Sequence, residues 1–205
     1  MTSYAYVDGE FIFENEVKKS KFITYVIGEI LEDNVESKIR EIQKQHSKAT
    51  HCTYAYIVNQ GQKSKCSDDG EPQGTAGKPI LSAIQNKSIV NTLVCVVRYF
   101  GGIKLGANGL VSEYNNSAVQ GLESSKIATK HLCTGAEISL SYECFEKVQN
   151  LLNKYGKCLN IEYSDIVRIE SYIKFADYDD VVSKINEITS SKVSIVKKEN
   201  KYINL

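Results

Sequence analysis

The sequence predicts an α+β protein of two domains. Its 205 residues exceed one average domain of roughly 150 residues. The apolar run over residues 92–100 is typical of a central strand buried on both faces. After about Gly135, alternating and helical patterns follow one another in the order β-α-β-β-α-β, the split-βαβ or ferredoxin-like arrangement. We therefore expect an N-terminal domain over residues 1–132 and a C-terminal domain over residues 133–205.

The N-terminal elements follow from short local patterns. Residues 4–13 mix aromatic and β-branched side chains and predict a strand. The further expected elements, in chain order, are a strand at 22–27, a helix capped by Asp33 or Asn34, a strand at 52–58 with a short partner after a turn at 59–62, a helix at 75–85, the buried strand at 92–100, and a helix at 107–122.

The C-terminal elements show clearer periodicity. Apolar residues alternate over 136–142, recur at helical spacing over 145–155, and stop at Gly156. The remaining elements predicted in this domain are strands at 159–163 and 167–175, a helix at 181–188 capped by Asp177, and a strand at 193–203.

Composition excludes several classes of protein. Apolar residues make up 42% and charged residues 24%, which argues against wholesale disorder. Lys and Arg number 25, as do Asp and Glu, so a strongly basic nucleic-acid binder is excluded, whereas a local basic groove is not. No apolar stretch approaches a membrane span and the N-terminus does not resemble a signal peptide, so we expect a cytoplasmic protein with no membrane partner.

The six cysteines point to reduced thiols. They are widely scattered, without a C-x-x-C pair or a Cys/His cluster at ligand spacing. We therefore expect no zinc site, and the sequence indicates no cofactor.

Two unusual segments, residues 67–81 and 96–111, hold the candidate chemistry. Each ends a predicted strand and leads through glycines into a helix, where free amides and the helix dipole favour an anion. The alternative is turn chemistry, with glycines serving positive φ angles and close packing. A nucleotide-binding P-loop is rejected, because only two residues separate Gly74 from Gly77 and Pro79 follows Lys78.

Asp68, Asp69 and Glu71 form an acidic group in the first of these segments. They either hold a divalent cation or form salt bridges that order the loop, with Arg98 as a candidate partner. No motif for a nucleophile and base is present, so no catalytic residue is predicted.

Four blocks, at residues 18–22, 49–56, 67–81 and 96–111, resemble the hallmark blocks of the IMPACT family, and specifically its bacterial YigZ-like branch. The resemblance covers the whole chain. It implies an N-terminal domain similar to domain 2 of ribosomal protein S5, followed by a ferredoxin-like domain similar to the fifth domain of elongation factor G. It also implies work on RNA or the ribosome. The eukaryotic members regulate translation through a kinase pathway with an extra N-terminal domain that this sequence lacks, so we do not transfer that role.

The resemblance and the residues together suggest one groove for an RNA backbone. The candidate phosphate-binding groups are Lys21, His51, Lys78, Arg98 and Lys104, with the amides of Gly74, Thr75, Gly101 and Gly102. The leading hypothesis is a non-catalytic RNA- or ribosome-associated regulator of translation. The alternatives are an enzyme or binder of a phosphorylated small molecule that uses the glycine-rich turn with Mg²⁺, and a module that binds a translation factor.

Overall fold

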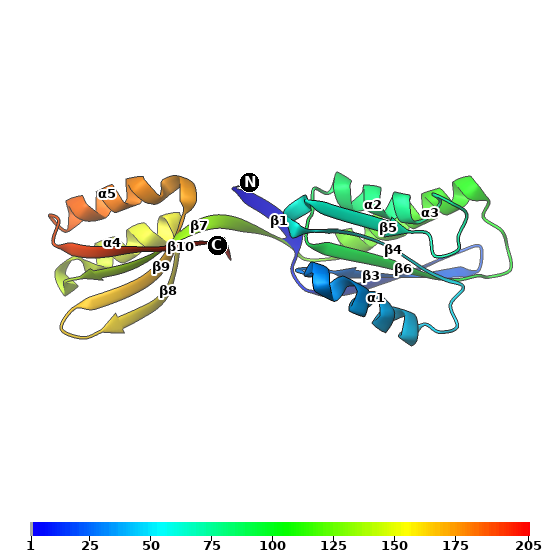
Figure 1. Ribbon diagram of the computed structural model, residues 1–205, viewed down its shortest axis with the longest axis horizontal. Coiled ribbons are helices and arrows are strands. Elements are labelled where there is room, and N and C mark those ends of the chain that lie inside the picture. The colour runs from blue at the N-terminus through cyan, green and yellow to red at the C-terminus, as the bar shows by residue number, and fades with distance from the viewer. Residues whose placement is uncertain (1) are drawn as a thin grey trace. The chain divides into compact units, whose positions relative to one another are not determined.

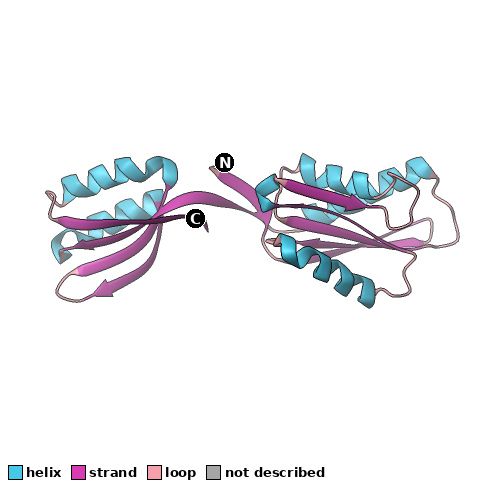
Figure 2. Ribbon diagram, viewed as in Figure 1, coloured by secondary structure: helices cyan, strands magenta, loops and turns pink. Residues whose placement is uncertain are grey.

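The computed structural model describes residues 2–205 and has two five-stranded sheets with helices packed on them (Figures 1 and 2). The predicted α+β class with two domains is therefore confirmed. The chain divides into two compact units, one of residues 5–128 and one of residues 1–4 with 129–205. We call them the N-terminal and C-terminal units.

The N-terminal unit is built on an antiparallel sheet with strand order β2-β3-β6-β4-β5. The central strand β6 is buried along nearly its whole length, as its apolar run predicts. The strands of this sheet are β2 (Glu10–Val17), β3 (Ser20–Ile27), β4 (His51–Val58), β5 (Lys63–Ser67) and β6 (Thr92–Tyr99).

Helices cover both faces of this sheet (Figure 1). One face packs against α1 (Glu32–Gln45), which contributes Val35, Ile39 and Ile42 to the core. The other face packs against α2 (Gly77–Asn86) and α3 (Ala107–Glu123). The three inner strands β3, β4 and β6 therefore supply alternate residues to two separate cores.

The strand expected at residues 4–13 is in fact two strands. β1 (Ser3–Val7) ends before Gly9, whose φ of +112° breaks the extended chain, and β2 begins at Glu10. β2 and β3 then form a hairpin, and the two residues at its tip, Lys18 and Lys19, have φ angles of 48° and 64°. This left-handed pair matches the tight turn that two-residue hairpins favour.

The C-terminal unit has the order β-α-β-β-α-β that the sequence predicts. Strands β10, β7, β9 and β8 lie side by side and pair antiparallel, while β1 is the other neighbour of β7. The elements are β7 (Ile127–Leu140), α4 (Tyr142–Tyr155), β8 (Gly156–Tyr163), β9 (Val167–Lys174), α5 (Tyr178–Ile188) and β10 (Val193–Asn204).

Two boundaries in this unit differ from the prediction. β7 begins at Ile127, well before the expected residue 136, because its first half also pairs with neighbouring strands. Tyr142 starts α4 instead of ending the strand. None of the helices within residues 2–205 has the length and apolarity needed to cross a membrane.

Candidate functional site

A row of side chains crosses one end of the N-terminal sheet. Phe22 of β3 and His51 of β4 both pair with Arg98 of β6. Directly opposed residues of antiparallel strands project from the same face, here the face packed against α2 and α3. The guanidinium carbon of Arg98 lies 5.6 Å from the ring centre of Phe22. A charged group and an imidazole are thus neighbours at the end of β6.

Glu71 joins this row from the loop before α2. Its Oε1 atom accepts hydrogen bonds from Arg98 Nη1 at 2.6 Å and from the Tyr114 hydroxyl at 2.7 Å, and it lies 3.8 Å from His51 Nε2. The side chains of Arg98 and Glu71 are only 6% and 3% exposed. Burial and the bond to Glu71 raise the pKa of Tyr114 far above its usual range, so its hydroxyl stays a donor. We call these four residues the Glu71 cluster.

Asp68 holds the loop against the start of α2. Its two carboxylate oxygens accept hydrogen bonds from the amides of Gly74, Ala76 and Gly77, at 2.8 to 3.0 Å. Burial opposes ionisation, but these bonds outweigh it and lower the pKa of Asp68. Asp68 therefore satisfies the exposed amides at the start of α2 from outside the helix.

Asp69 fastens the same loop to β4. Its carboxylate accepts the Cys52 amide at 2.6 Å, and its carbonyl accepts His51 Nδ1 at 2.7 Å. A carbonyl oxygen only accepts, so Nδ1 carries the proton and Nε2 of the neutral ring is free to accept. Each acidic residue thus bonds within the unit, in agreement with the loop-ordering hypothesis. Within residues 2–205, no group of three or more His, Cys, Asp or Glu side chains is arranged to hold a metal ion.

The Glu71 cluster opens into a cleft of about 430 Å³. His51, Glu71 and Arg98 line it from the sheet and the first loop. Phe100 and Lys104 line it from the loop after β6, and Phe100 is 46% exposed. The remaining lining residues are mostly apolar or small: Thr50, Pro72, Leu105, Gly106, Ala107 and Leu110.

The start of α3 faces this cleft. Gly106, with φ of +77°, precedes the helix, and no side chain of the described residues caps its first turn. The first backbone bond runs from the Leu110 amide to the Gly106 carbonyl, so the amides of residues 107–109 have no partner within the helix. They add positive potential at the wall that Gly106 and Ala107 form.

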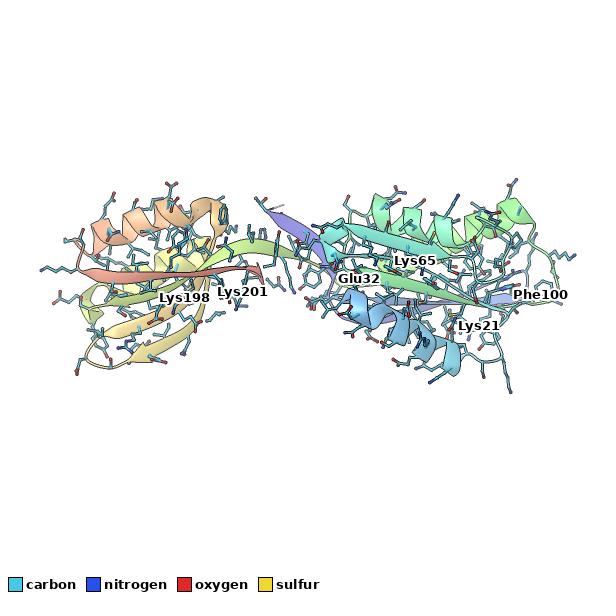
Figure 3. The ribbon with its side chains drawn as sticks, viewed as in Figure 1. Lys21, Glu32, Lys65, Phe100, Lys198 and Lys201 are labelled. Carbon is cyan, nitrogen blue, oxygen red and sulfur yellow. The ribbon has the colours of Figure 1, made fainter. Side chains whose placement is uncertain are left out.

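Exposed lysines surround the same end of the unit. A Cβ on Gly101 would lie 1.9 Å from the Lys19 carbonyl oxygen, so the tip of the β2–β3 hairpin touches the loop that carries Lys104. Figure 3 shows Phe100 at this end of the unit. Within the part of the chain that the structure describes, these lysines form no ion pair: Lys18, Lys19, Lys48, Lys78 and Lys104.

The structure corrects the expected role of Arg98. We expect from the sequence a mobile positive charge that contacts phosphate, whereas its guanidinium is buried and paired with Glu71. Its charge is therefore compensated inside the unit by Glu71, and it is not the mobile, unpaired charge expected from the sequence. His51, Lys104 and Gly102 remain accessible, and Lys78 is exposed on the first turn of α2 beside Asp68.

Lys21 does not belong to the same face. It precedes Phe22 on β3, so it points to the side covered by α1, where it forms a salt bridge with Glu14 at 2.7 Å. Figure 3 shows it at the end of the unit near Phe100. The single groove expected from the sequence therefore loses Lys21.

Three of the expected amide ligands are already bonded. The amide of Gly74 donates to Asp68, that of Thr75 to the Pro72 carbonyl, and that of Gly101 to the Ser20 hydroxyl. These amides stabilise the two loops, as in the alternative interpretation in which the glycines serve the turns and not an anion site. The open start of α3 takes their place as the nearest source of free amides.

Sequence reasoning missed Phe100 and Tyr114 as residues of the site. Phe100 ends the apolar run and looks like a buried strand residue, but the strand stops at Tyr99. Tyr114 looks like an ordinary core position of a helix, and only the fold brings its hydroxyl to Glu71. The glycine turn directly after Phe100 was the one available signal that its ring lies at a surface.

The C-terminal unit carries a second cavity, of about 480 Å³, on its sheet. Two of its lining lysines are paired with lining glutamates, Lys198 with Glu137 at 2.9 Å and Lys201 with Glu199 at 2.7 Å. Because both lysines of this cavity are already paired with carboxylates, we place the candidate site in the N-terminal cleft.

The fold and the cleft define a two-domain α+β protein with a partly charged site at one end of its N-terminal sheet. The family profile described as the Impact N-terminal domain matches residues 18–122, which include every lining residue of the cleft. The chain belongs to the IMPACT family.

Relatives cover nearly the whole chain. The IMPACT family member YvyE of Bacillus subtilis is 34% identical over 189 residues, which are 91% of this chain and 87% of that protein. The IMPACT family member YigZ of Escherichia coli is 28% identical over 185 residues, 88% of this chain and 91% of its own. A solved structure, titled as the crystal structure of a hypothetical protein, is 27% identical, with a TM-score of 0.64 over 97% of this chain and 98% of that one. The similarity thus includes both units.

Proposed function

We propose that this protein is a non-catalytic RNA- or ribosome-associated regulator of translation that binds nucleic-acid phosphate at the N-terminal cleft. The observation that carries the proposal is the cleft itself, where Lys104 and the uncapped start of α3 meet beside an exposed aromatic ring. Free amides and ammonium groups are the usual phosphate ligands, and exposed aromatic rings stack on unpaired bases.

The charge distribution supports binding to a short stretch of RNA. The chain as a whole has no net charge, so it lacks the means to coat nucleic acid indiscriminately. The lysines around the cleft end are exposed and unpaired, whereas Lys21 and Arg98 are already compensated. About three to five phosphate contacts would give a modest affinity that depends strongly on salt.

The test is a titration of single-stranded RNA with the full chain at several salt concentrations. With three to five contacts, the logarithm of the affinity should fall with the logarithm of the salt concentration with a slope of about −2 to −3.5. Lys104→Ala should weaken binding at low salt and reduce the slope by roughly 0.7.

Lys65→Ala is the matched control, because Lys65 is an exposed lysine of β5 away from the cleft (Figure 3). It should leave affinity and slope nearly unchanged. Affinity that ignores salt, or that survives Lys104→Ala intact, would contradict binding at this cleft.

A second candidate function is binding or turnover of a small phosphorylated molecule. The cleft of about 430 Å³ lies in the size range of small-molecule sites, and the His51 ring is oriented by the Asp69 carbonyl. Thermal shifts with nucleotides and phosphorylated metabolites, with and without Mg²⁺, distinguish this candidate. A large shift with ATP that requires Mg²⁺ would favour it over RNA.

A further inference from the structure

The floor of the cleft offers two hydrogen-bond acceptors side by side. The polar contacts of the Glu71 side chain all involve Oε1, and Oε2 accepts no hydrogen bond from residues 2–205. Oε2 is not one of the buried side-chain atoms that lack a hydrogen-bond partner, so this unbonded oxygen is not sealed from solvent. His51 Nε2 lies 3.8 Å from Oε1, and because Nδ1 donates to the Asp69 carbonyl, Nε2 is the acceptor atom of the neutral ring. A ligand that reaches the floor therefore meets two acceptors.

The floor accepts hydrogen bonds without carrying net charge. The Glu71 carboxylate is compensated by the buried guanidinium of Arg98. A phosphate has no donor to offer at neutral pH and would be repelled by Oε2, so it does not belong here. A second cation would add unbalanced charge in a partly desolvated place. The group that fits is neutral and presents two adjacent N–H donors.

The walls select a flat group. Phe100 is 46% exposed, and the guanidinium carbon of Arg98 lies 5.4 Å from its ring centre, which holds the ring at the cleft. Leu105, Leu110 and Pro72 supply apolar surface around it. An aromatic heterocycle stacked on Phe100 would cover this surface and bring one polar edge to the floor.

We infer that the cleft takes an unpaired guanine nucleotide within single-stranded RNA, and this inference rests on the proposed function. Guanine presents N1–H and the N2 amino group next to each other on its Watson–Crick edge. Adenine and cytosine present one exocyclic amine beside an acceptor, and uracil presents one N–H between two carbonyls. In this arrangement the guanine donors bond to Glu71 Oε2 and His51 Nε2, while the phosphate lies at the mouth, near Lys104 and the start of α3.

The experiment compares short uridine oligonucleotides that differ at one central base: guanine, inosine, adenine, cytosine or uracil. All have the same length and charge, so the phosphate contribution is constant. The full chain should bind the guanine oligonucleotide on the order of tenfold more tightly than the uracil one. Inosine lacks the N2 amino group and should lose most of that gain. Free GMP forms a separate arm, and it should bind much more weakly than the guanine oligonucleotide because it lacks the neighbouring phosphates.

The possible outcomes separate the inference from the proposed function. Equal, salt-dependent binding of all five oligonucleotides would overturn the guanine site and leave RNA binding in place. No binding of any oligonucleotide would overturn both. GMP that binds as tightly as the guanine oligonucleotide would keep the base site but overturn RNA as its source.

His51→Leu tests the floor directly. It removes the Nε2 acceptor, so guanine can no longer donate two hydrogen bonds to the floor. Because such a bidentate pair is what discriminates between bases, the preference for guanine over inosine and uracil should fall to less than about twofold. Binding of the uracil oligonucleotide should change little. His131→Leu, the same change on β7 of the C-terminal unit, is the control and should keep the full preference. An unchanged guanine preference in a folded His51→Leu protein would contradict the inference, and the comparison of bases stands even if this variant fails to fold.

Discussion

Glu71 is the residue around which the candidate site is organised. One of its oxygens accepts hydrogen bonds from both Arg98 of β6 and Tyr114 of α3. A carboxylate buried to this extent is tolerated only when its charge is paired and its hydrogen bonds are made. The Glu71 cluster therefore ties the loop before α2 to β6 and α3 through a single atom.

Removing Arg98 should be costly. Arg98→Ala leaves the Glu71 carboxylate buried without its partner, and we expect a loss of about 3–5 kcal/mol in the free energy of unfolding. Lys21→Ala, which breaks an exposed salt bridge to Glu14, should cost far less, because exposed ion pairs contribute little to stability. Urea unfolding of both variants measures the difference.

The double variant Glu71→Ala with Arg98→Ala refines this comparison. Its cost should be smaller than the sum of the two single costs, because neither charge is then left alone. If Arg98→Ala proves as mild as Lys21→Ala, the pair does not hold the loop as described.

At the scale of elements, the loop between β5 and α2 supplies the cap of α2 from a residue that lies several positions before the helix. Asp68 lies well ahead of α2 in the sequence, yet it binds the amides at and just before the helix start. The local sequence patterns for helix caps, such as the capping box, place the cap next to the first turn and therefore do not predict this role of Asp68. The loop needs the positive φ of Gly70 and Gly74 to turn back on itself.

Asp68→Asn should lower stability by about 1 kcal/mol at neutral pH, because the amide cannot offer two acceptor oxygens to the three backbone donors. The pKa of Asp68 is lowered in the folded protein, so its contribution is complete above its ordinary pKa of 3.8 and is lost as the pH falls through the lower folded value. The difference between the wild type and the variant should therefore shrink only below about pH 4. Urea unfolding at neutral and acidic pH measures it.

Asp165→Asn is the control, because Asp165 is exposed in the turn between β8 and β9. It should change stability little at either pH. A difference for Asp68→Asn that grows as the solution is acidified would contradict the role of its ionised form.

At the scale of the whole molecule, the sequence was sufficient for the class of fold and most elements. The apolar run of β6 and the alternation in the C-terminal unit identify strands because burial dictates them locally. The strand break at Gly9 and the early start of β7 were missed, since they depend on pairing with distant strands.

The candidate site was predictable only in its location. The two glycine-containing segments are visible in the sequence, and Glu71 and Arg98 meet where they converge. Which face each side chain takes depends on strand register, so Lys21 and Arg98 could not be separated beforehand. Whether Arg98 is paired with a carboxylate likewise depends on the folded chain, which brings Glu71 to it.

Burial across the molecule also predicts a pattern of thiol reactivity. The six cysteines, all within the described residues, are free. Burial, with a contribution from Asp69, raises the pKa of Cys52 to about 12, so it holds almost no thiolate at mildly alkaline pH. Labelling with iodoacetamide, followed by peptide mass spectrometry, should modify the half-buried Cys66 and Cys144 first and leave Cys52, Cys95 and Cys133 largely unmodified.

Labelling in guanidinium chloride provides the control, since all six thiols should then react at similar rates. Rapid modification of Cys52 in the native protein would show that β4 opens more readily than its buried position indicates.

The contact between Gly101 and the tip of the β2–β3 hairpin fixes where Lys18 and Lys19 lie relative to the loop that carries Lys104. A hydrogen atom at position 101 allows the two backbones to touch, and any larger substituent would collide with the Lys19 carbonyl. The position of the Lys18 and Lys19 backbone beside the loop that carries Lys104 is therefore set by main-chain packing. Adding one methyl group there would push two positive charges outward and weaken long-range attraction without altering any residue of the cleft.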